Sequence, residues 1–172
     1  MRSAPGALTT RVVGSVIEAL YLSADTDRVQ ALLASDPVGT VTLTVTEKGY
    51  HRRLDTGALD VTAPPIAADL AATAGDDLRP GTVLGQLAGG LRARMHRAGG
   101  PIDVVSCDNM AGNGPALAGV VRGYIEASAW VDRDRVLDWL DEFVSFPATI
   151  VDRIVPATTD EDRDLASAAL GL

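Results

Sequence analysis

The chain has 172 residues, of which 47% are hydrophobic and only 4% aromatic, and this suits one globular domain with an aliphatic core. A formal net charge of −8 argues against nucleic-acid or membrane-surface partners, which require basic patches. One cysteine excludes an internal disulfide, and no apolar run resembles a signal peptide or a membrane span. We therefore expect a soluble cytoplasmic protein.

The first third of the chain predicts strands and a helix in alternation. Residues 1–10 are small and polar and contain Pro and Gly, which is typical of a disordered lead-in. The run 11–22, rich in Val, Ile and Leu, predicts a strand, and residues 25–34 predict a short helix. Alternating β-branched residues at 40–46 predict a further strand, and 55–65 predict a polar loop.

The middle of the chain predicts helices at 66–73 and 83–98. The second helix carries several basic residues near its end, where positive charge complements the helix dipole. We expect them to form a solvated face, with an anion site as the less favoured alternative; they are Arg92, Arg94, His96 and Arg97.

The organising stretch is a short β-branched run followed by a polar turn and a helix. Residues 102–105 predict a buried parallel strand, and the turn 106–114 contains two asparagines. Asn113 occupies the expected N-cap position of the next helix. Beyond it, the pattern predicts an amphipathic helix at 136–144, a last strand at 149–154 and another helix at 158–170, so the chain reads as parallel α/β.

Three ordered stretches resemble one known family. Residues 106–114 read S-C-D-N-M-A-G-N-G, residues 42–50 read T-L-T-V-T-E-K-G-Y, and residues 146–159 read F-P-A-T-I-V-D-R-I-V-P-A-T-T. All three are similar to motifs of the mannitol dehydrogenase family, the long-chain polyol and uronate dehydrogenases. The third departs from the family's pattern at Ile150 and Val155, where the family has Met and Thr.

The resemblance implies an incomplete Rossmann-like parallel sheet flanked by helices. Residues 11–172 would form a partial NAD-binding domain, with the first nucleotide-binding strand–turn–helix and the C-terminal substrate domain absent. It implies NAD as cofactor, a polyol or ketose as substrate, and hydride transfer between them without a metal. Partners would be the small-molecule substrate and a complementing chain or a second copy, with no nucleic acid and no membrane.

Asn109 is the candidate catalytic residue. Its carboxamide can donate two hydrogen bonds, enough to polarise a ketone or to hold the alkoxide formed by hydride transfer. An Asx-type turn that satisfies local backbone groups is the structural alternative, and the residues alone leave the two open. The resemblance implies the first, since the asparagine closing S-C-D-N belongs to the family's oxyanion-binding pair.

Two further residues are substrate-binding candidates. Asn113 is most simply a helix cap, with a ligand role as the alternative. Asp152 follows an apolar run, and the resemblance implies that it binds substrate hydroxyls, whereas an internal ion pair with Arg153 would fix the strand end.

Thr46 and Glu47 follow the 40–46 strand, and the resemblance implies contacts with the cofactor for both. Lys48 is the only lysine, but it does not stand in the family's K-x-x-x-x-N-x-x-H context, so we do not expect it to be the general base.

Other chemistries fit the sequence less well. The window 112–117 has the spacing of a dinucleotide fingerprint but ends in Leu117, where helix–strand packing requires Gly or Ala. His51 and His96 stand far apart with no cysteine pair, which makes a zinc site unlikely to form. We expect Cys107 to be a small buried residue rather than a nucleophile.

Two hypotheses follow for the function. In the first, the chain is a fragment of an NAD-dependent oxidoreductase that interconverts a sugar alcohol, such as mannitol or mannitol 1-phosphate, and the ketose. In the second, it is a non-catalytic remnant or one piece of a split protein without activity of its own.

Overall fold

The computed structural model describes residues 12–75, 79–151 and 158–171. They fall into two units, which we describe separately: residues 20–151 form one, and residues up to 19 together with those from 152 onward belong to the other. The second unit contains helix α6 (Asp160–Leu170). Its first turn is fixed by a capping box, in which the Thr159 hydroxyl accepts from the Asp162 N–H and the Asp162 carboxylate accepts from the Thr159 N–H.

The larger unit is built on a parallel sheet in the order β1–β2–β3, formed by β1 (Thr40–Leu43), β2 (Ile102–Ser106) and β3 (Val144–Ser145). Its helices are α1 (Leu22–Leu33), α2 (Pro64–Ala72), α3 (Val83–His96), α4 (Asn113–Ala127) and α5 (Arg133–Phe143), with a 3₁₀ helix, η1 (Glu47–Tyr50), after β1. The predicted α/β class with a Rossmann-like parallel sheet is confirmed.

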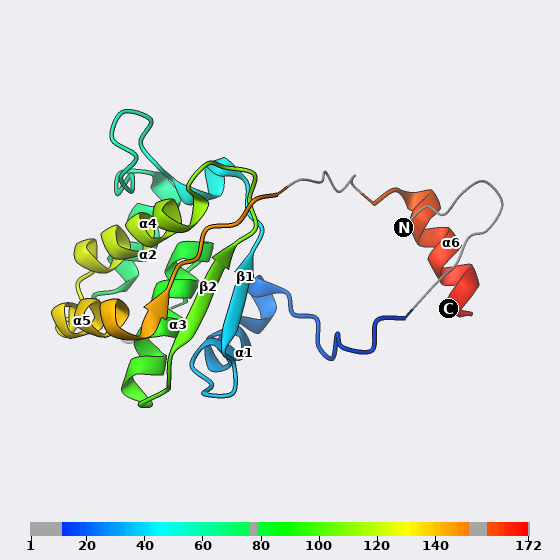
Figure 1. Cartoon of the computed structure of the whole chain (residues 1–172), viewed down its shortest axis with the longest axis horizontal. Helices are drawn as coiled ribbons and strands as arrows, with labels where there is room; N and C mark the ends of the chain where they lie inside the picture. The colour runs from blue at the N-terminus through cyan, green and yellow to red at the C-terminus, as the bar shows by residue number, and fades with distance from the viewer. Residues whose placement is uncertain (1–11, 76–78, 152–157, 172) are drawn as a thin grey trace. The chain divides into compact units, whose positions relative to one another are not determined.

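The described part of the sheet buries one face. Ile102, Val104 and Ser106 of β2 are buried, and Val41 and Leu43 of β1 pack against the same core. In Figure 1 the strands face the viewer and α3 lies behind them, in contact with α1 and α4.

The opposite face of the sheet carries exposed side chains. Thr40 and Thr42 of β1 stand in register with Asp103 and Val105 of β2, and the first three are exposed. Ser145 of β3 pairs in register with Asp103 and hydrogen-bonds to its carboxylate. Alternation along β2 therefore separates an apolar inner row from a largely polar outer row.

Two predicted strands are wrong. Residues 12–21 form no strand; Val12 is 70% and Ile17 93% exposed, so the β-branched run has no strand to pair with among the described residues. Residues 149–151 are also irregular, and 152–154 lie outside the described residues. The edge of β2 is taken by Val144–Ser145, and Thr149 instead bonds to the turn that follows β2.

The predicted solvated face at the basic end of α3 is wrong for Arg94, which is buried, whereas His96 and Arg97 are exposed. Arg94 is 1% exposed, and its guanidinium donates to the carbonyls of Ser35 (2.5 Å) and Gly100 (2.8 Å), with weaker contacts to neighbouring carbonyls. Arg92 and His96 both bond to Asp132, at 2.9 and 2.7 Å. These side chains tie α3 to the segments after α1 and before α5.

Candidate functional site

The candidate site lies where β1 and β2 end. In open α/β sheets ligands collect outside the carboxyl ends of the strands. Here the turn after β2 and the segment after β3 enclose a hollow of about 380 Å³, lined by residues 108–112 and 148–151. Asn109 lines it, as the sequence predicted for a candidate catalytic residue at this edge.

Asp108 joins the ends of the two strands. Its Oδ1 accepts a hydrogen bond of 2.6 Å from the backbone N–H of Val45, which follows β1. Its Oδ2 accepts one of 2.6 Å from the Tyr50 hydroxyl and lies 3.3 Å from the Ser106 hydroxyl. Asp108 is 7% and Tyr50 1% exposed, so the two turns are linked by a buried hydrogen-bond network.

The Tyr50 hydroxyl stays protonated under physiological conditions. Burial, and then the hydrogen bond to Asp108, raise the pKa of Tyr50 to about 12. Tyr50 therefore acts as a donor to the carboxylate.

Asn113 anchors the same turn from the other side. It is fully buried, and its Nδ2 lies within hydrogen-bond distance of the carbonyls of Ser106 (3.3 Å), Asp108 (3.0 Å) and Thr149 (3.2 Å) and of the Thr149 hydroxyl (2.9 Å). Its Oδ1 accepts from the backbone N–H of Thr149 at 3.0 Å and of Gly114 at 2.8 Å. The N-cap itself is Gly112, with a φ of 63°, and Asn113 is the first helical residue. Its side chain thus connects β2, α4 and the segment after β3.

Asn109 differs from Asp108 and Asn113, the two buried residues of the same turn. It is exposed, and its carboxamide makes no hydrogen bond to any residue in the described ranges. The Asx-turn alternative is not what the structure shows, because the turn is closed by a backbone bond from Met110 N to the Asp108 carbonyl at 2.8 Å. The amide is free to meet a ligand in the hollow.

The remaining predicted residues lie around this edge or beyond it. Thr46 is the N-cap of η1 and Glu47 its first residue; both are exposed, and they follow directly on Val45. Lys48 is exposed on the same turn. Asp152 lies outside the described residues.

The segment after β3 packs closely against Gly114 in the first turn of α4. A Cβ placed on Gly114 would lie 2.4 Å from the Phe146 carbonyl oxygen and 2.8 Å from the Ala148 nitrogen. The glycine therefore permits the segment after β3 to cross the start of the helix.

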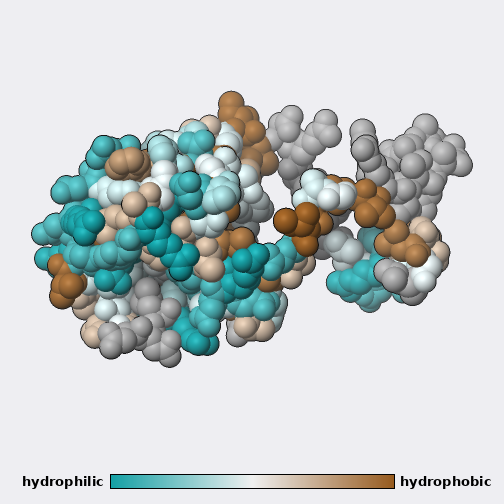
Figure 2. Space-filling model, turned by 90° about the horizontal axis from the view of Figure 1, so that it is seen from below, coloured by the Kyte–Doolittle hydropathy of each residue, from teal (hydrophilic) through white to brown (hydrophobic). Residues whose placement is uncertain are grey.

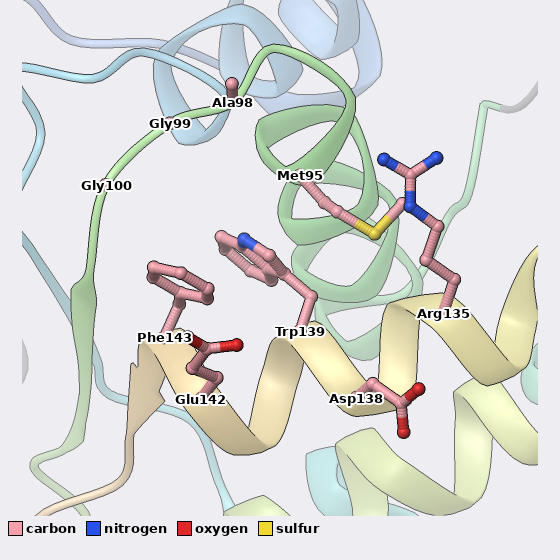
Figure 3. A pocket seen from close by; sticks show the side chains of 9 residues that line it. All are labelled: Met95, Ala98, Gly99, Gly100, Arg135, Asp138, Trp139, Glu142 and Phe143. Carbon is pink, nitrogen blue, oxygen red and sulfur yellow. The ribbon is translucent and has the colours of Figure 1, made fainter.

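A second hollow, of about 440 Å³, lies near the start of β2 and away from the candidate residues. Figure 3 shows Trp139 and Phe143 projecting from α5 beside the Gly99–Gly100 stretch, with Met95 of α3 on the far side. The two rings stack at 5.5 Å between centroids. None of the predicted site residues lines this hollow.

Sequence reasoning missed Asp108, Tyr50 and Thr149 as parts of the site. All three stand inside the motifs that carry the family resemblance, Asp108 and Tyr50 beside residues that were singled out. The available signal was the position of a carboxylate and a phenol at the ends of two adjacent parallel strands.

We expect Asn113→Ala to lower the free energy of unfolding by about 3 kcal/mol, because the N–H groups of Thr149 and Gly114 would lose the Asn113 Oδ1 that accepts from both. The matched control is Asn109→Ala in the same turn, which removes an exposed, unbonded amide and should change stability by less than about 0.5 kcal/mol. Urea unfolding of the two variants measures the difference. Equal losses would contradict the assignment of Asn113 as the anchor.

Tyr50 also predicts how stability changes at alkaline pH. Because the unfolded tyrosine ionises near 10 and the folded one near 12, the contribution is fully present below pH 10 and is lost as the pH rises toward 12. Tyr50→Phe removes this proton, so its stability should fall less steeply over the same window. Urea midpoints between pH 9 and 12 test this, and parallel curves for the two proteins would refute it.

The family described as "Mannitol dehydrogenase Rossmann domain" matches residues 3–169. The uncharacterised oxidoreductase YdfI of Escherichia coli K12 is 40% identical over 155 residues, which are 89% of this chain and 30% of YdfI. A mannitol 2-dehydrogenase of Phaeosphaeria nodorum is 38% identical over 156 residues, 90% of this chain and 26% of that protein.

A solved structure of a mannitol 2-dehydrogenase also matches this chain. The Pseudomonas fluorescens mannitol 2-dehydrogenase, in a ternary complex with NAD and D-mannitol, superposes with a TM-score of 0.78 at 29% identity, covering 91% of this chain and 30% of that one. The chain thus spans about 30% of the length of YdfI and of this structure. The match over nearly all its residues shows that this chain belongs to the mannitol dehydrogenase family, in that family's Rossmann domain.

Proposed function

We propose that the chain contributes the substrate edge of the Rossmann domain to an NAD-dependent dehydrogenase that interconverts a sugar alcohol and the corresponding ketose. The observation that carries the proposal is the exposed Asn109 amide, unbonded within the described residues, at the carboxyl edge of β2. The buried polar side chains of this turn, Ser106, Asp108 and Asn113, are all hydrogen-bonded, so we assign the unbonded amide at the ligand edge a chemical rather than a structural purpose.

The cofactor would meet this chain at the turn after β1. Thr46 and Glu47 are exposed there, one and two residues beyond the Val45–Asp108 hydrogen bond, and can contact the nicotinamide side of NAD. We do not assign the diphosphate to the amino terminus of α4, because the window 112–117 ends in Leu117 and Gly114 packs against the backbone of Phe146–Ala148. The bound cofactor supplies the hydride acceptor for alcohol oxidation and the hydride donor for ketose reduction.

We assign separate roles in the reaction to individual residues of this chain. Asn109 donates to the substrate oxygen as it takes on alkoxide character. Asn113 and Asp152 are proposed as further substrate-side residues, Asn113 through the turn that it anchors. Lys48 is not assigned as the base, and proton transfer falls to a residue that the described site does not contain.

The alternative is that the 172 residues have no activity of their own. The sequence has no other G-x-G-x-x-G window and no K-x-x-x-x-N-x-x-H stretch, so neither a phosphate loop nor the family's base can be assigned to it. NADH formation from mannitol, sorbitol or mannitol 1-phosphate by the purified chain tests the alternative: we expect none above background, and clear NADH formation would contradict it.

The catalytic role of Asn109 is tested in a full-length family member that carries the same turn. Asn109→Ala should lower kcat about 10²–10³-fold while the affinity for NAD stays nearly constant, because the amide meets charge that develops in the transition state. Asn113→Ala is the control, with a loss of stability and a modest kinetic effect. If Asn109→Ala kept full turnover, the proposal would fail.

We also propose that another chain, either a complementing one or a second copy, pairs with β1. In the described sheet, β1 pairs only with β2, so its outer edge offers unpaired backbone groups. The outer face there carries the exposed side chains of Thr40, Thr42 and Asp103. Figure 2, which views the molecule from below, shows separate brown patches among teal and white on that side of the larger unit. Strand pairing rather than apolar burial would therefore drive association.

We expect the isolated chain to self-associate as its concentration rises. Light scattering across a hundred-fold range should show an increasing mean mass. A Thr42→Pro variant, which places proline in an edge strand, should reduce it if the β1 edge is the contact. A constant monomer mass for the unmodified chain would contradict the proposal.

A further inference from the structure

We propose that Asp108 is a positioning residue that sets the cofactor-side turn and the Asn109 turn relative to each other. This rests on the proposed function, since it concerns how that site is assembled. The carboxylate receives Val45 N–H from one turn and precedes Asn109 in the other, 63 residues away in sequence. Thr46 and Asn109, the residues assigned to the two reactants, are thus each one residue from the same hydrogen bond.

The exposed Asn109 needs such a support. Its side chain makes no hydrogen bond to a described residue, so its position depends on the backbone of residues 107–112. Productive donors must be held to within a fraction of an ångström of where charge develops. Asp108 and Asn113, the two buried polar side chains on either side, supply that constraint.

The contacts of Asp108 indicate that its carboxylate acts by holding the two turns in place and not through its charge. No cation pairs with Asp108 in the described part of the chain, and its oxygens are satisfied by neutral donors from Val45, Tyr50 and Ser106. A negative charge beside the substrate oxygen would disfavour the alkoxide character that this oxygen takes on. A neutral asparagine could keep most of the bridge, accepting from Val45 N–H and donating to the Tyr50 oxygen.

Amide hydrogen exchange of the 172-residue chain tests this without requiring turnover. Asp108→Ala should raise exchange at 44–50 and 106–112 together, by about ten-fold or more, while α3 and α4 keep their protection. Asp108→Asn should restore both turns. Because no activity is measured, a failure of the proposed function leaves this result unaffected.

The matched control is Asp69→Ala, at a second buried carboxylate that accepts from Gly81 N–H, Thr82 N–H and the Thr82 hydroxyl. It should loosen residues 79–82 and leave the two site turns unchanged. If Asp108→Ala does not fold, Tyr50→Phe keeps the ring and deletes one bond to the carboxylate, and both turns should still respond together.

Three results would overturn the proposal. Faster exchange at 106–112 alone would show that Asp108 acts only within its own turn. Faster exchange throughout α3 and α4 would show a general loss of stability. No recovery in Asp108→Asn, or no response of either turn in Tyr50→Phe, would show that the hydrogen-bonded bridge does not fix the site.

Discussion

The buried carboxylate of Asp108 is the interaction on which the geometry of this site depends. A carboxylate removed from water costs several kcal/mol unless its oxygens are hydrogen-bonded. Here the Val45 N–H and the Tyr50 hydroxyl each donate at 2.6 Å, and both residues follow the carboxyl end of β1 in the chain. The requirement to satisfy one charge therefore holds two turns together, and Asn113 fixes the second turn to the segment after β3. What remains between the two anchors is the exposed Asn109.

Elements set by local sequence were predictable, and those set by distant partners were not. β1 and β2, and the helices from α1 to α6, fall within a few residues of their predicted ranges, because periodicity and turn residues are local signals. The runs 11–22 and 149–154 have the same β-branched composition, yet their described residues form no strand, since a strand also requires an edge to pair with. Arg94 was misread for a related reason: its acceptors lie on other segments.

The site shows the same division. Asn109 and its position at the strand end could be inferred from the motif, but the Asp108–Tyr50 bond spans 58 residues, and nothing in either local sequence states that the two meet. Asn113 was predicted as a cap because asparagine at a helix start usually serves there. Its burial instead directs the amide across the turn to Thr149, a contact 36 residues away that only the packed structure defines.

The two asparagines of this turn separate stability from chemistry. Asn113 is buried with every polar atom bonded, so its side chain contributes to folding and cannot also reach a ligand without breaking those bonds. Asn109 is exposed and contributes no bond to the described fold, so its identity is free of structural constraint. Proteins depart from locally optimal choices mainly where function requires it. A turn that satisfies its buried polar groups and leaves one exposed amide at the ligand edge is such a departure, and it is the reason for proposing Asn109 as the catalytic residue.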